Sequence, residues 1–145
     1  MQITSPVFVD GGNLPAKYTC LGKGVNPPLE WSQVPVNTKT LALIVDDPDA
    51  PGGVFSHWVL WDIPVAITGV AENSLPLEAV VGVESSGTNE YFAPCPPSGA
   101  HRYRFKLYAL DKELFLSINT RQADLERAMN GHVLGEAILT GLFEK

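Results

Sequence analysis

Proline- and glycine-rich segments cut the most apolar part of this chain into short pieces. Residues 47–53 (DPDAPGG) must form a loop, because proline has a fixed φ angle and no backbone N–H to donate inside a strand or helix. This loop separates two short β-rich runs, residues 40–46 (TLALIVD) and 54–62 (VFSHWVLWD). A second loop, residues 87–99, precedes a third run at 102–110. The pattern predicts strands joined by irregular loops.

The third run alternates between apolar and basic residues, which is the period of a strand with one wet face. Its apolar face is expected to hold Tyr103, Phe105, Leu107 and Ala109, and its solvated face Arg102, Arg104 and Lys106. A weaker strand signal lies at 79–84, and the final apolar segment, residues 137–143, is expected to form a closing strand. We expect Trp31, Trp58 and Trp61 to belong to the core.

One helix is predicted near the C-terminus. Thr120 is the expected N-cap and Gly131 the expected residue after the C-cap, and a stripe of apolar residues repeats at helical spacing between them. The 13 glycines and 12 prolines make up about 17% of the chain, against a background of about 12%, which favours turns over helices. We therefore predict one domain over residues 1–145, an all-β-dominated antiparallel β-sandwich with a short C-terminal helix.

Charge and hydropathy exclude several classes of protein. The net charge is −6, and no cluster of Lys and Arg is present to hold a phosphate backbone, so no nucleic-acid partner is expected. No apolar run reaches the roughly 18 residues that span a bilayer. The N-terminus does not resemble a signal peptide, so we expect a cytoplasmic protein with Cys20 and Cys95 reduced. Removal of a leader would instead make it periplasmic or secreted.

Three titratable residues stand where predicted strands meet the loops: Asp47, His57 and His101. Each shares the parity of largely apolar neighbours, which are Leu41, Leu43 and Val45 for the first, Phe55, Val59 and Trp61 for the second, and Tyr103 and Phe105 for the third. A polar group on such a face needs a partner or must stay neutral. If the three strands are neighbours, these side chains converge at one rim of the core. His132, just after the helix, is expected at the surface.

Four interpretations of this cluster remain open. The first is a pocket in which imidazole and backbone N–H groups bind a small anion. The second is a metal site, since two His and one carboxylate match the facial triad of non-haem iron. The third is nucleophilic catalysis by Cys95 with His101; Ser56 and His57 are excluded as a pair, because adjacent strand residues point to opposite faces. The fourth is a purely structural role.

The motifs resemble those of one protein family. Residues 47–51 (DPDAP) followed by His57-Trp58 resemble the first block of the phosphatidylethanolamine-binding proteins, also called Raf kinase inhibitor-like proteins. Residues 94–99 (PCPPSG) followed by His101-Arg102-Tyr103 resemble the second block. Further similarity to the bacterial and archaeal branch lies at 17–20 (KYTC), 26–31 (NPPLEW), 34–35 (VP) and 131–137 (GHVLGEA).

This resemblance implies a β-sandwich with a Greek-key element and a small surface pocket for phosphate, acetate, cacodylate or a phosphoethanolamine head group. Carried over residue by residue, the pocket-lining set is Asp47, Asp49, His57, Pro96, His101 and Tyr103. Cis peptides are expected at Pro51 and at one proline of the Pro96-Pro97 pair. Cys20 and Cys95 both lie in family-like segments and would form a disulfide if they are close in space, which would suit an exported protein.

The implied function is binding of a small anionic or phosphorylated ligand, with regulation of a kinase or protease as its consequence. The alternatives are a serine-protease inhibitor or signalling regulator that acts through protein contacts, and then a His/His/Asp hydrolase or metal-dependent enzyme. We expect no catalytic residue, cofactor or metal. The expected partners are the small ligand and a kinase or protease; a homodimer is compatible, and membrane contact is at most peripheral.

Overall fold

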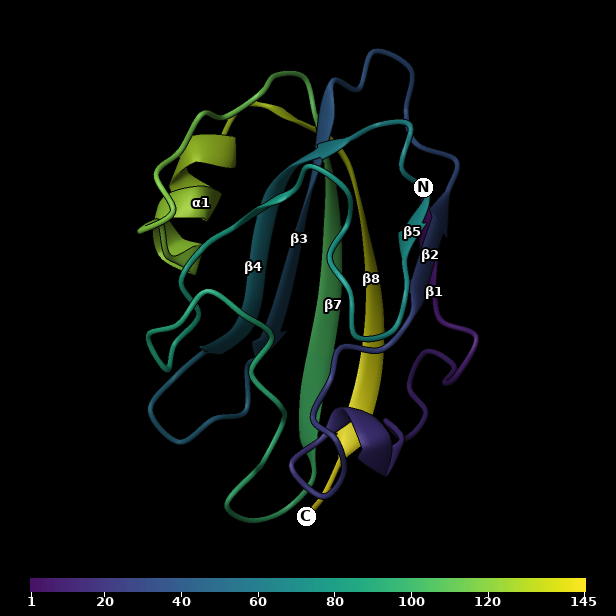
Figure 1. Cartoon of the computed structure of the whole chain (residues 1–145), viewed down its shortest axis with the longest axis vertical. Coiled ribbons are helices and arrows are strands. Elements are labelled where there is room, and N and C mark those ends of the chain that lie inside the picture. Colours follow the sequence, from purple (N-terminus) through teal and green to yellow (C-terminus); the bar gives the residue numbers. More distant parts are fainter.

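Two antiparallel sheets and one short helix make up the computed structural model, which describes residues 1–145 (Figure 1). The larger sheet has the strand order β6 (Val80–Val81), β4 (Phe55–Pro64), β3 (Thr40–Asp47), β7 (His101–Leu110) and β8 (Val133–Phe143). The smaller sheet has the order β1 (Gln2–Thr4), β2 (Leu29–Ser32) and β5 (Gly69–Val70). A 3₁₀ turn, η1 (Ala16–Tyr18), follows β1, and α1 (Gln122–Met129) precedes β8. The predicted two-sheet fold with a late helix is confirmed.

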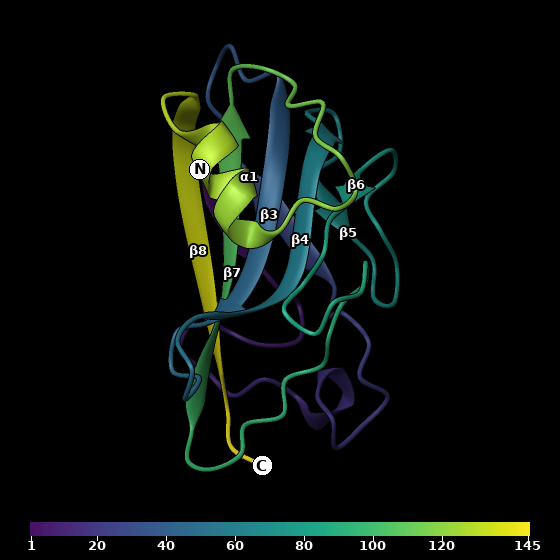
Figure 2. The same cartoon turned by 90° about the vertical axis from the view of Figure 1, so that its left-hand side faces the viewer.

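The larger sheet is the middle of three layers, with α1 on one face and the smaller sheet on the other (Figures 1 and 2). One apolar cluster fills the space between the sheets and includes Leu43, Trp58 and Phe105. A second cluster lies under α1 and includes Ile44 and Trp61. Because both faces are covered, all eight residues of β3 are buried, which explains why its sequence is a continuous apolar run. The three tryptophans are buried as predicted.

The expectation of a solvated basic face on β7 is confirmed for Arg102, whose side chain is 56% exposed, and is wrong for Lys106. Lys106 is only 6% exposed, because its side chain and that of Arg104 lie on the part of the sheet that α1 and its flanking loops cover. Arg104 is half-buried there, and both side chains form ion pairs with the fully buried carboxylate of Asp46. Basic residues can therefore lie on a covered face of the sheet, because the buried carboxylate of Asp46 balances their charge.

A β-bulge in β4 changes which way His57 points. Val45 pairs with Trp58 and Asp46 pairs with Ser56, so His57 is the extra residue that has no partner in β3. As a result His57 lies on the same side of the sheet as Trp58, and not with Val59 and Trp61 as the strand parity predicted. Asp47 and His101 follow the predicted parity.

Several element boundaries differ from the predictions. The N-cap of α1 is Arg121, which makes no side-chain capping bond, while the Thr120 backbone N–H closes a turn onto Ser117. β8 begins at Val133, four residues before the expected start at 137. The predicted strand at 79–84 is reduced to the two residues of β6. His132 is half-exposed and contacts Asp111 at 2.8 Å, close to the surface position expected.

Cys20 and Cys95 form a disulfide, with their Cα atoms 5.4 Å apart, so the expectation of two reduced thiols is wrong. This separation lies within the range that a disulfide bridges.

The expected cis peptides are also absent: every peptide bond is trans, including those before Pro51, Pro96 and Pro97. Around Pro51 the chain reverses through a trans turn in which Gly53 N–H donates to Ala50 C=O at 3.1 Å. None of the helices has the length and apolar character that crossing a membrane requires.

Candidate functional site

The three strands that carry Asp47, His57 and His101 are neighbours in the order β4-β3-β7. Asp47 is the last residue of β3, and His101 is the first of β7. Antiparallel pairing brings these ends together with the start of β4, where His57 lies. The expected convergence is confirmed, since all three residues line one hollow of about 180 Å³.

Apolar side chains and prolines make up most of the remaining lining of the hollow. Its other lining residues are Ala50, Pro51, Phe55, Phe92, Cys95, Pro96, Pro97 and Tyr103. Pro96 and Tyr103 were predicted from the sequence, whereas Phe55 and Phe92 were missed. The only sequence signal for these two phenylalanines is their position in or beside the loops that carry the motifs.

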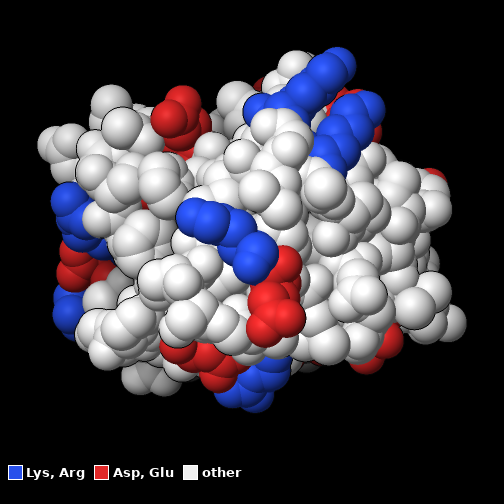
Figure 3. All heavy atoms as spheres, turned by 90° about the horizontal axis from the view of Figure 1, so that it is seen from below, with Lys and Arg blue, Asp and Glu red and all other residues white.

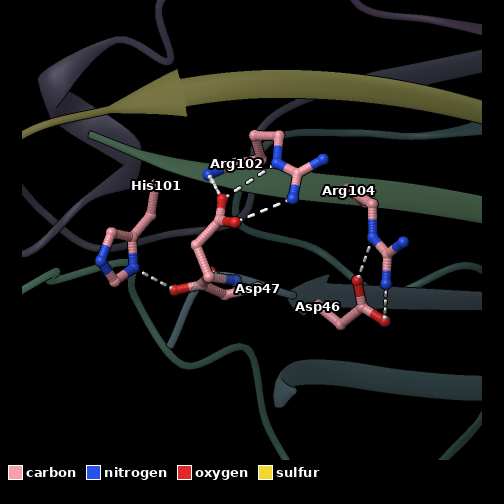
Figure 4. Close-up of polar contacts among 6 residues, drawn as sticks. Asp46, Asp47, His101, Arg102 and Arg104 are labelled. Carbon is pink, nitrogen blue, oxygen red and sulfur yellow. Dashed lines mark hydrogen bonds and ion pairs between the residues drawn. The ribbon is translucent and has the colours of Figure 1, made fainter. Parts of the chain in front are cut away.

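His101 and Asp47 form a buried pair in which Nδ1 of the imidazole lies 2.6 Å from Oδ2 of the carboxylate (Figure 4). The two residues are only 6% and 3% exposed. The other carboxylate oxygen of Asp47 accepts the backbone N–H of Asp49 at 2.8 Å. Because an ionised carboxylate only accepts, Nδ1 of His101 carries the proton and Nε2 is the ring nitrogen left for a ligand.

His57 is held in the same way by a different acceptor. Its Nδ1 lies 2.6 Å from the backbone C=O of Phe92, which can only accept, so Nδ1 donates here too. Burial lowers the pKa of His57 below its ordinary value, which keeps the imidazole neutral near pH 7. Its Nε2 is then an acceptor, and becomes a donor only when the ring takes up a proton.

Tyr103 separates the two imidazoles. The His57 ring meets it edge to face at a centroid distance of 5.3 Å, and the His101 ring stacks on it at 6.4 Å. Tyr103 is 1% exposed, and burial raises the pKa of its hydroxyl, so the phenol stays neutral. Tyr103 thereby holds the two rings apart as a rigid, uncharged surface.

Asp49 does not line the hollow, although the resemblance placed it there. Its carboxylate receives three hydrogen bonds from Arg102, two from the guanidinium at 3.0 and 2.8 Å and one from the backbone N–H at 2.9 Å. The side-chain hydrogen bond from Arg102 is the main reason that the pKa of Asp49 falls to about 2. Asp49 therefore fastens the loop after β3 to the start of β7 and positions the hollow from outside.

The disulfide supports the wall opposite the strands. Cys95 lines the hollow and is bonded to Cys20, whose backbone N–H also donates to Pro94 C=O at 3.0 Å. A bonded sulfur is not a thiolate, so the interpretation of Cys95 as a nucleophile beside His101 is wrong for this structure.

No group of three His, Cys, Asp or Glu side chains has the arrangement of a metal site. Asp47 directs one oxygen to His101 Nδ1 and the other to a backbone N–H, instead of sharing a ligand position with the two imidazoles.

Viewed from this end of the molecule, basic and acidic side chains are interspersed among wide uncharged areas (Figure 3).

Fold and site together define a two-sheet β-sandwich protein with a small His- and Pro-lined hollow at one end of its larger sheet. The family model for phosphatidylethanolamine-binding protein matches residues 4–144. A UPF0098 protein of Methanothermobacter thermautotrophicus is 49% identical over 100% of this chain and 99% of its own length. The chain belongs to the phosphatidylethanolamine-binding protein family.

Two crystal structures support this assignment. CT736 of Chlamydia trachomatis, described as a homologue of phosphatidylethanolamine-binding protein, has a TM-score of 0.95 and 40% identity, covering 99% of this chain and 97% of its own. YbcL of E. coli, described as a member of the mammalian family, has a TM-score of 0.93 and 31% identity, covering 99% and 98%.

Proposed function

We propose that the hollow binds a small anionic or phosphorylated ligand, such as a phosphate or a phosphorylated head group, without chemical change. The observation that carries this proposal is that the two imidazoles are held by the protein in the same way. Each has its Nδ1 taken by a protein acceptor, Asp47 for His101 and Phe92 for His57, and each has Nε2 left over beside the same hollow. When protonated, both Nε2 atoms donate to ligand oxygens.

Size and polarity favour a compact ligand. A volume of about 180 Å³ is below the roughly 300–1,000 Å³ of sites that enclose drug-sized molecules. It suits an oxyanion or a head group better than an acyl chain. The apolar walls of Phe55, Phe92 and the prolines exclude water, which strengthens hydrogen bonds between an imidazolium and an oxyanion.

Catalysis has less support than binding. The Asp47–His101 pair has the form of a base with an orienting carboxylate. However, the lining of the hollow includes no Ser, Thr or Lys, and its one cysteine is in the disulfide. Regulation of a kinase or protease, or action through protein contacts alone, stays a prediction.

The disulfide bears on location. Such bonds persist mainly in oxidising compartments. Of the locations that the sequence left open, we propose the periplasmic or extracellular one over the cytoplasmic one. Mass spectrometry of the native protein from its source cells, after alkylation of free thiols, tests this: an unmodified Cys20–Cys95 pair supports it, and two alkylated cysteines contradict it.

Calorimetry and NMR test the binding proposal. Phosphate and phosphoethanolamine are titrated at about pH 5.5 and about pH 8, on either side of the ordinary histidine pKa. We expect tighter binding at the lower pH, shifts of the His57 and His101 ring signals, and loss of binding in His101→Ala. His132→Ala is the matched control, because His132 contacts Asp111 outside the hollow. Absence of a response from both rings at both pH values overturns the proposal.

A further inference from the structure

A second hollow, of about 320 Å³, lies on the opposite face of the larger sheet, between the strand ends and the start of α1. We propose that it is a separate binding site for a small polar organic anion that carries a carboxylate or phosphate group. Ser56 lines this second hollow while the next residue, His57, lines the first, so the two sites lie back to back across β4. The inference does not depend on what the first hollow binds.

Three basic side chains line the second hollow. Arg104, Lys106 and Arg121 are three of the ten basic residues of a protein with net charge −6, and they line one hollow. Two carboxylates, Asp46 and Glu126, also line it, which leaves an excess of one positive charge. This local sign is opposite to that of the whole protein and favours an anion.

The carboxylate of Asp46 fixes the floor of the second hollow. It is fully buried and accepts two hydrogen bonds from Arg104, at 2.8 and 3.1 Å, and one from Gln122 at 2.8 Å. The Lys106 ammonium lies 2.7 Å from the same carboxylate. Burial alone would raise the pKa of Asp46, but these donors hold it below its ordinary value, so the floor is charged and rigid.

Donors remain after these contacts are made. Lys106 is 6% exposed and has three N–H groups, of which one ion pair engages one. Arg104 uses Nε and Nη2 on Asp46, and its Nη1 donates no hydrogen bond to the protein. Arg121 makes only one long bond, from Nη1 to the backbone C=O of Glu84 at 3.5 Å. A ligand oxygen in the hollow would receive these donors.

The remaining wall suits the polar part of an organic anion. The hydroxyls of Ser56 and Ser85 lie 3.0 Å apart and share one hydrogen bond, and Ser85 Oγ also accepts the Ser56 backbone N–H at 2.8 Å, so one hydroxyl proton remains to donate to a ligand. Glu126 lies one turn after Gln122 on α1 and is exposed, so its carboxylate opposes an anion at the rim. The affinity of the second hollow for an anion should therefore increase when the charge of Glu126 is removed.

The test is a titration of ¹⁵N-labelled protein with citrate and, separately, with inorganic phosphate, up to about 20 mM, well beyond a millimolar dissociation constant. The amides of Gln122, Ala123 and Ser85 report on the second hollow, and the His57 and His101 rings report on the first. We expect saturable shifts at the three amides. Saturation by citrate alone identifies a carboxylate site, and saturation by phosphate identifies a phosphate site.

Three variants separate the site from incidental contact. Arg121→Gln should weaken binding roughly tenfold, the effect of losing a charged hydrogen bond. Glu126→Gln should strengthen it by removing the opposing charge. Arg127→Gln, the same charge change on the same helix at an exposed residue that pairs with Asp124, should leave it unchanged.

His101→Ala should leave the second site unaffected, so failure of either site is recognised independently. The proposal is overturned if neither anion gives saturable shifts at the three amides. It is equally overturned if Arg121→Gln and Glu126→Gln both bind as the unmodified protein does.

Discussion

Asp46 and Asp47 are consecutive residues of β3, so their side chains point to opposite faces of the sheet, and each carboxylate holds a different partner (Figure 4). Asp47 accepts from His101 at the hollow between the layers, and Asp46 accepts from Arg104 beneath α1. Two adjacent acidic residues at a strand end therefore anchor two different polar clusters. Each cluster gives separate predictions.

Asp46→Asn should lower the free energy of unfolding by about 3–5 kcal/mol, because it leaves the Lys106 ammonium buried without its counter-charge. Urea unfolding measures this loss. Asp124→Asn is the control, since its ion pair with Arg127 is exposed and should be worth less than about 1 kcal/mol. Equal losses in the two variants would contradict a buried charge cluster.

Asp47→Asn should weaken phosphate binding roughly tenfold at about pH 5.5, although Asp47 need not touch the ligand. The carboxylate accepts from Nδ1 of His101, which orients the ring and fixes which ring nitrogen faces the hollow. Calorimetry of this variant, with ¹⁵N NMR of the His101 ring, checks both effects. An unchanged affinity together with an altered ring tautomer would show that orientation of His101 does not govern binding.

The His57 ring should titrate below the ordinary histidine value of about 6.5, since burial favours its neutral form. A lowered folded-state pKa means that the unfolded chain binds the proton more tightly. The free energy of unfolding that depends on neutral His57 is therefore fully present above about pH 6.5. It is lost as the pH falls from there toward the pKa of His57 in the folded protein. Unfolding at about pH 7.5 and about pH 5.5 should show this loss, and His57→Gln should reduce it.

Removal of the disulfide should lower the free energy of unfolding by about 4.5 kcal/mol, the chain-entropy value for a closed loop of this length. The bond joins residues 75 positions apart. The Cys20→Ser, Cys95→Ser double variant, compared with the oxidised protein in urea, measures the loss. Phosphate affinity should fall as well, because Cys95 lines the hollow. A stable variant with unchanged affinity would show that the wall is held by other contacts.

Gly82→Ala should destabilise the protein by about 1–3 kcal/mol, the usual cost of an overpacked site. An added Cβ would lie 2.5 Å from the Thr120 carbonyl oxygen and 2.5 Å from the Trp61 ring, and neither neighbour is free to move. Gly52→Ala is the control, because a Cβ there meets nothing within 4 Å. Thermal unfolding of both variants should show a lowered midpoint for Gly82→Ala alone.

The strands that carry the hollow could be predicted from the sequence, because short apolar runs bounded by proline and glycine form few structures other than strands. The sequence also located Asp47 and His101 on the correct side of their strands. The covered part of β7 was not predictable, since Arg104 and Lys106 have the pattern of a solvated face until their shared buried counter-charge, Asp46, is known. Asp49 was misplaced, because the motif gives its position in the loop and not its bond to Arg102.

The unpaired residue in β4 decides which layer receives an imidazole. Loss of one residue from the start of that strand would restore regular alternation and rotate the ring out of the hollow, with every side chain chemically intact. Deletion of a residue at the start of β4 would thus impair ligand binding in the hollow more completely than most substitutions. A family member with the same histidine and one residue fewer here would keep the motif and lack the site.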